Sequence, residues 1–102
     1  MIGVLAGKWA APVLLALGEQ PLRYNRLLER LPGVSRRMLT ATLRGLARDG
    51  LVERRQLSAM PKRVQYSLTP AGFELLDVLD ELARWERRHA RILTGAPIGS
   101  SF

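Results

Sequence analysis

The chain has 102 residues, no cysteine and a single histidine. Without cysteine it can form neither a disulfide scaffold nor a thiolate zinc site, and it cannot sense oxidants through a thiol. One histidine beside nine carboxylates suggests no nucleophile–base pair and no ligand cluster. We therefore expect no catalytic residue, no metal and no cofactor, and an enzyme is the least favoured class of function.

The chain also lacks an apolar run long enough to cross a membrane. The longest uncharged run near the amino terminus, residues 9–18, is far shorter than the ~20 residues that a transmembrane helix needs. Lys8 lies inside the apolar stretch rather than ahead of it, and no signal cleavage site is evident. We expect this segment to be core, in a cytoplasmic protein with no membrane partner.

Acidic residues are scarce where basic residues are dense. Residues 23–63 contain eleven Lys and Arg but three Asp and Glu, so this segment carries +8 while the whole chain carries +7. Positive charge localised in this way predicts a surface that binds a polyanion. The alternative is a solvated basic surface that only keeps the protein soluble.

Hydrophobic content of 47% is enough for one domain with a real core. Apolar spacing and turn residues predict this domain over residues 1–93 and a flexible, Gly/Ser/Pro-rich tail over 94–102. An extended stub is expected at 22–24, and strands at 51–57 and 64–68 would form a hairpin around a loop at 58–63. The predicted helices span residues 8–17, 25–31, 36–48 and 70–93. This order predicts a mainly α fold with a small β-hairpin wing, a winged helix-turn-helix.

Local signals define the ends of these helices. Gly18 is expected to close the first helix, whose Pro12 fits only in the first turn. Ser35 is the expected N-cap of the third helix, and Gly50 its left-handed C-terminal residue. Thr69 is the expected N-cap of the last helix.

The helix over residues 36–48 has two faces. At ~100° per residue, Leu39, Leu43 and Leu46 lie within ~60° of one another and predict a packing face. Arginine can grip guanine or a phosphate, and Thr40 can donate to a base or phosphate. An ordinary amphipathic surface helix is the alternative, but the preceding turn and the following hairpin favour DNA reading. The predicted DNA-contacting residues here are Ser35, Arg36, Arg37, Thr40, Ala41, Arg44 and Arg48.

Basic residues also occur in the hairpin. Lys62 and Arg63 follow Pro61 at its expected tip and are predicted to contact the minor groove or phosphates. A solvated turn is the alternative. Arg54 and Arg55 occupy adjacent strand positions and point to opposite faces, so at most one should face DNA.

The last helix has more apolar surface than one domain needs. Its apolar residues cover about 200° of the circumference, whereas packing on a single domain takes a stripe of ~100° or slightly more. An identical subunit across a two-fold axis is the simplest partner, and folding back onto the same chain is the alternative. The predicted dimer-interface residues are Trp9, Leu79, Leu82, Trp85, His89 and Leu93. For His89, a pH-sensing or metal role is a minor alternative.

Six segments in order carry a resemblance to a known family. They are Gly7–Trp9, Arg23–Leu27, Leu31–Thr40, Leu43–Leu46, Asp49–Arg54 and Arg63–Gly72. With these segments the chain resembles HxlR-type winged helix-turn-helix transcriptional regulators over about residues 5–90. Family members usually carry a longer amino-terminal arm, often with a cysteine, and this sequence departs from that pattern.

The resemblance implies a bacterial or archaeal homodimer without enzymatic activity, bound to a two-fold operator in double-stranded DNA. It also implies that residues 35–48 lie in the major groove and that residues 58–63 form the wing. Two alternatives from other classes are a non-specific nucleic-acid-binding module and a protein-interaction module. The basic stretch holds only one aromatic residue, Tyr24, which disfavours a single-strand binder. The sequence does not identify a small-molecule effector.

Overall fold

The computed structural model describes residues 7–90, and these residues form a mainly helical fold with a small antiparallel sheet. This confirms the predicted winged helix-turn-helix. Residues 1–6 and 91–102, which include Leu93 and the predicted tail, lie outside the described residues. The elements in order are α2 (Ala10–Glu19), β1 (Leu22–Arg23), α3 (Tyr24–Arg30), α4 (Arg36–Arg48), β2 (Val52–Ala59), β3 (Lys62–Leu68) and α5 (Pro70–Arg88).

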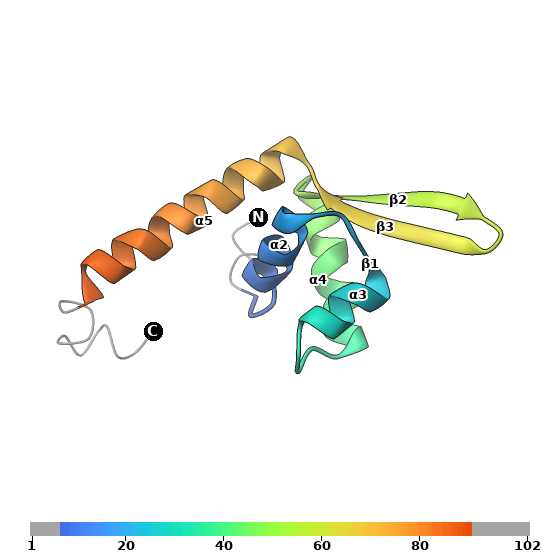
Figure 1. Cartoon of the computed structure of the whole chain (residues 1–102), viewed down its shortest axis with the longest axis horizontal. Coiled ribbons are helices and arrows are strands. Elements are labelled where there is room, and N and C mark those ends of the chain that lie inside the picture. The colour runs from blue at the N-terminus through green and yellow to red at the C-terminus, as the bar shows by residue number, and fades with distance from the viewer. Residues whose placement is uncertain (1–6, 91–102) are drawn as a thin grey trace.

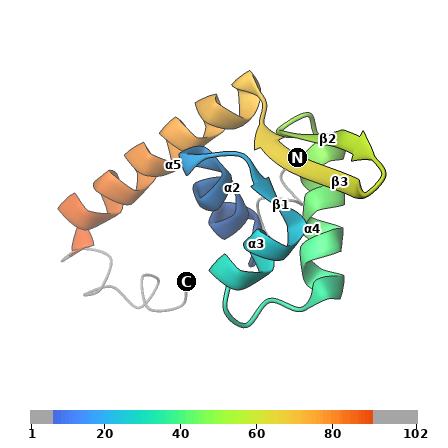
Figure 2. The same cartoon turned by 45° about the vertical axis from the view of Figure 1, so that its right-hand side comes forward.

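Helices α2, α3 and α4 group together, while the β2–β3 hairpin and α5 leave this group in different directions (Figures 1 and 2). Leucine, valine and alanine side chains from the three helices and the sheet form the core, in which Leu14, Leu27 and Leu46 have no exposed surface. Helix α5 contributes much less, because its only buried residue is Gly72. Helix α5 therefore contacts the core through a narrow side that includes Leu75, Leu76 and Leu79, and most of its surface is exposed.

The ends of α4 and α5 follow the capping residues in the sequence. The Ser35 hydroxyl accepts a hydrogen bond from the Met38 backbone N–H at 3.0 Å, and Gly50 has a φ of 77° just after α4. The Thr69 hydroxyl accepts from the Gly72 N–H at 3.1 Å and donates to the Gly50 carbonyl at 2.6 Å. One side chain thus starts α5 and ties it to the end of α4.

The sheet has the strand order β1-β3-β2, with both pairs antiparallel. The predicted extended stub forms strand β1 of this three-stranded sheet, since Leu22 pairs with Tyr66 and Arg23 with Gln65 of β3. A bulge lies between Gln56 and Ser58 of β2. β1 therefore anchors the wing to the start of α3.

Several predicted boundaries were wrong. Helix α2 runs through Gly18 to Glu19, and Gly18 lies against the Leu76 side chain of α5, which would have to shift to make room for a Cβ there. The loop expected over residues 58–63 is shorter, since β2 ends at Ala59 and β3 begins at Lys62. Helix α5 ends at Arg88, before the expected end at residue 93.

Candidate nucleic-acid interface

Helix α4 separates an apolar face from a cationic face. Leu39 and Leu46 are completely buried and Leu43 is 2% exposed, so the leucine side packs inside the subunit. The opposite side is open to solvent and carries Arg37, Ala41, Arg44 and Arg48. The burial that the sequence predicted for the three leucines is confirmed, and it holds the arginine-bearing side outward.

The other predicted contact residues lie around this face. Arg36 is exposed in the first turn, next to the cap residue Ser35, and Lys62 and Arg63 are exposed at the start of β3. Thr40 differs because it is only partly exposed, on the flank of α4. Its hydroxyl is hydrogen-bonded to the Tyr24 hydroxyl, with 2.9 Å between the two oxygens.

Among residues 7–90, no carboxylate forms an ion pair with this cationic surface. Ion pairs between described residues join Arg26 to Glu29, Arg30 to Glu19, Arg55 to Glu53 and Arg84 to Asp80. Within residues 7–90, no ion pair involves the six cations predicted to contact DNA. Their charge is therefore available to an external anion. These cations are Arg36, Arg37, Arg44, Arg48, Lys62 and Arg63.

The two wing cations point to opposite faces of the sheet. Side chains alternate along β3, so Lys62 shares a face with Val64 and Tyr66, and Arg63 does not. Lys62 and Val64 also line one cavity together with the start of α3. Lys62 therefore lies on the side of the wing that faces the helices.

Arg54 is an additional cation on the face of the sheet that is turned toward α4. The sequence left open whether Arg54 or Arg55 lies on this face, and the structure assigns it to Arg54. Arg54 pairs with Tyr66 across the sheet and lines a cavity of about 240 Å³ between α4 and the sheet, together with Thr40 and Arg44. Arg55 instead pairs with Glu53 at 3.6 Å. The sequence holds a signal for this choice, since Arg54 is two residues after Val52, which is buried on the same face.

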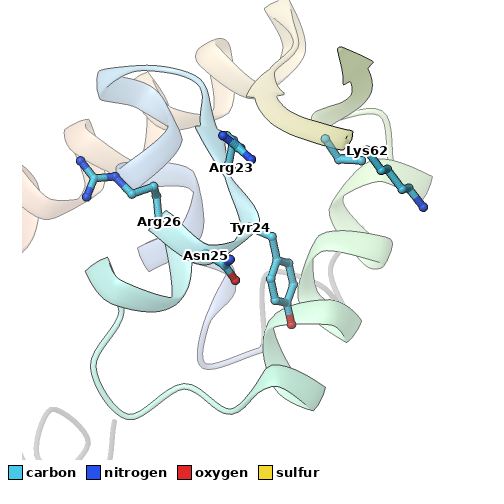
Figure 3. A pocket seen from close by; sticks show the side chains of 6 residues that line it. Arg23, Tyr24, Asn25, Arg26 and Lys62 are labelled. Carbon is cyan, nitrogen blue, oxygen red and sulfur yellow. The ribbon is translucent and has the colours of Figure 1, made fainter. Parts of the chain in front are cut away.

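Arg23 and Arg26 form a second group of cations with Lys62, and the sequence reasoning named only Lys62 of the three as a contact residue. A cavity of about 430 Å³ lies between the start of α3 and the wing, and Figure 3 shows side chains that line it. Arg26 and Lys62 extend to opposite sides of this view, and Tyr24 points toward α4. Sequence reasoning could not place this group, because β1 joins the wing through a pairing more than 40 residues apart. The cavity is lined by Arg23, Tyr24, Asn25, Arg26, Lys62 and Val64.

Tyr24 connects α3 to α4. Its hydroxyl donates to the Arg36 carbonyl at 2.9 Å and is bonded to Thr40 at the same distance. The Arg36 guanidinium lies 5.9 Å from the centroid of the Tyr24 ring. The lone aromatic residue of the basic stretch is therefore engaged with α4 and offers no open stacking platform.

Comparison with known proteins identifies the family. Residues 4–92 match the family model described as HxlR-like helix-turn-helix. The chain belongs to the HxlR-like helix-turn-helix family.

Similar proteins agree with this assignment. An HTH-type transcriptional regulator of Methanothermobacter thermautotrophicus is 36% identical over 88 residues, which are 86% of this chain and 67% of that protein. The HTH-type regulator YdzF of Bacillus subtilis is also 36% identical, over 82% of this chain and 78% of its own length. A crystal structure from Enterococcus faecalis V583, described as a MarR-family transcriptional regulator, has a TM-score of 0.83 at 34% identity and covers 93% of this chain and 86% of its own. The HxlR-like protein is thus a transcriptional regulator of the winged helix-turn-helix type.

The HxlR-like protein has a second distinctive surface on α5. Val78 is 57% exposed, Leu82 50% and Trp85 43%, whereas Leu79 is partly buried against the core. Glu81, Arg84 and Arg88 border these exposed side chains. An apolar stripe flanked by both signs of charge results, on a helix that extends away from the other helices (Figure 1).

The remaining predicted interface residues are divided between this stripe and the core. The His89 ring stacks on Trp85 with 4.5 Å between ring centroids, and its Nδ1 lies 2.9 Å from the Trp85 carbonyl. Because a carbonyl only accepts, Nδ1 carries the proton in this bond. Trp9 instead packs against the core of its own subunit.

The described residues 7–90 contain no group of three or more His, Asp or Glu side chains placed to hold a metal ion. Within the same range, no helix is both long and apolar enough to span a bilayer.

Proposed function

We propose that the HxlR-like protein is a homodimer that binds a pseudo-palindromic operator in double-stranded DNA with sequence specificity. One observation carries this proposal: the leucine face of α4 is buried in the subunit, and the opposite face is cationic and exposed. A helix supported on one side and basic on the other suits insertion into the major groove.

Each predicted contact then has a role that matches its chemistry. Arg37 and Arg44 would contact base edges, since a guanidinium can bond guanine O6 and N7 together. Ala41 would let the helix lie close to the groove floor. Arg48, Arg36 and the first turn after Ser35 would contact phosphates. Lys62 and Arg63 would contact the backbone or minor groove beside the wing.

The homodimer is inferred from α5. Three large apolar side chains that stay about half exposed on one helix form an unusual surface for a monomer. Glu81 and Arg88 beside the same stripe offer complementary charges to a second copy turned by 180°. Two reading helices would then lie about 34 Å apart, one turn of B-DNA. Leu79, Leu82, Trp85 and His89 would contribute to this contact.

The proposal is tested by selecting duplexes from a random pool and by measuring the mass of the protein in solution. We expect enrichment of a two-fold symmetric sequence, strongly salt-dependent binding and a dimer at micromolar concentration. Equal affinity for scrambled duplexes would instead identify a non-specific module, and no affinity at low salt would identify a protein-interaction module. Because the proposed ligand is chromosomal DNA, the proposed location is the cytoplasm, and no reaction is assigned.

A further inference from the structure

Hydrogen bonds within the subunit determine whether the Thr40 hydroxyl acts as a donor or as an acceptor. The Tyr24 hydroxyl lies 2.9 Å from the Arg36 carbonyl and 2.9 Å from the Thr40 Oγ1. A carbonyl oxygen can only accept a hydrogen bond, so the Tyr24 hydroxyl uses its single proton to donate to the Arg36 carbonyl. Thr40 must then donate its own proton to Tyr24.

Thr40 is left with lone pairs and no proton for a ligand. Thr40 is partly exposed and lines the cavity between α4 and the sheet, together with Arg44 and Arg54. Because this group is an acceptor only, it cannot bond a phosphate oxygen, which is also an acceptor. It requires a hydrogen-bond donor.

In the major groove the bases differ in this respect. Adenine and cytosine present an exocyclic amino group that donates, whereas guanine and thymine present only acceptors there. We infer that Tyr24 makes Thr40 a reader of amino-bearing bases, so that the operator position below Thr40 is adenine or cytosine on the strand it contacts. This inference rests on the proposed placement of α4 in the major groove.

Thr42 shows that the arrangement at Thr40 is specific. It is also a threonine of α4, but its hydroxyl donates to the Met38 carbonyl of its own helix at 2.8 Å. The equivalent carbonyl for Thr40, that of Arg36, is occupied by Tyr24. The hydroxyl of Tyr24 therefore acts as a positioning group for Thr40 from a different helix.

The test is selection of operators with the full-length protein and three variants. Thr40→Val removes the acceptor and identifies the operator position that Thr40 reads. Tyr24→Phe removes one oxygen and keeps the ring beneath Arg36, so Thr40 regains a free proton. Thr42→Val is the matched control on the same helix. Affinity for random duplex is measured in parallel, and the Thr42→Val control should leave it unchanged.

We expect the wild type to prefer adenine or cytosine at the position identified by Thr40→Val. Tyr24→Phe should reduce that preference about tenfold, the effect of one hydrogen bond, and admit guanine and thymine. Preferences elsewhere should persist, and Thr42→Val should change none. A wild-type preference for guanine or thymine, or an unchanged preference in Tyr24→Phe, would overturn the inference.

A change in the DNA tests the same bond when Tyr24→Phe folds poorly. Replacing the amino group of the selected base by hydrogen should weaken wild-type binding about tenfold and leave Thr40→Val unaffected. An equal loss in both proteins would overturn the inference. If Thr40→Val alters no operator position, the inference fails and the proposed function stands. If the wild type enriches no sequence, both fail.

Discussion

Helices α4 and α5 are both amphipathic, but only α4 completes its packing within the subunit. The leucines of α4 are at most 2% exposed, whereas Val78 and Leu82 of α5 are at least 50% exposed. The polar faces differ too, because that of α4 carries arginine and no carboxylate, whereas that of α5 mixes carboxylates with arginines. An amphipathic pattern therefore predicts a helix, but not which molecule covers its apolar side.

The largest change in free energy should come from truncating a buried leucine of α4 to alanine. We expect Leu46→Ala to lower the free energy of unfolding by about 2–5 kcal/mol, because the side chain is fully buried and a cavity would remain. Chemical denaturation at fixed protein concentration measures this change. A loss under about 1 kcal/mol would mean that α4 is not anchored as described.

The same substitution in α5 should act on assembly. Leu82→Ala should weaken dimerisation by about 1–3 kcal/mol, since each subunit would lose apolar area at the proposed interface. Sedimentation equilibrium measures the dissociation constant. Leu57→Ala is the matched control, because Leu57 is 49% exposed but lies in the wing. If both variants dimerise like the wild type, α5 is not the interface.

A third test removes charge from the exposed side of α4. Arg44→Ala should cost about 1–3 kcal/mol of operator binding and relax specificity at one base pair. Arg55→Ala is the control, since Arg55 is paired with Glu53 on the opposite side of the sheet. Titration of each variant against the operator and against single-base variants of it separates a loss of specificity from a general loss of affinity. Equal losses from both variants would assign the effect to general charge.

The smallest effect is expected in the wing. Lys62→Ala should weaken binding to all duplexes alike and reduce the slope of log affinity against log salt by about one. Titrations at several salt concentrations, with operator and scrambled DNA, provide this slope. A loss confined to the operator would instead make Lys62 a base contact.

The elements that sequence predicted well are those with local causes. Ser35, Gly50 and Thr69 mark helix ends through bonds or backbone angles within a few residues, and all three have the predicted roles. The leucine spacing of α4 likewise predicted its buried face, because helical periodicity needs no knowledge of the partner.

Three features that the sequence did not assign depend on distant segments. Gly18 was expected to end a helix, but it lies inside α2 and against Leu76 of α5. The stub at β1 became a strand through Tyr66 and Gln65, which no local pattern indicates. Arg54 could have been assigned from strand parity with Val52, but only the packed sheet shows that this face reaches α4.

By itself, the sequence determined the helices, the capped ends of α4 and the start of α5, and the concentration of positive charge between residues 23 and 63. These features come from caps, spacing and composition, which act over a few residues or need no geometry. Only the tertiary structure decided that Arg54 lies beside Arg44 and that the Tyr24 hydroxyl is hydrogen-bonded to both the Arg36 carbonyl and the Thr40 hydroxyl. Both depend on how separate elements are oriented, because a hydrogen bond needs its two atoms within about 3 Å.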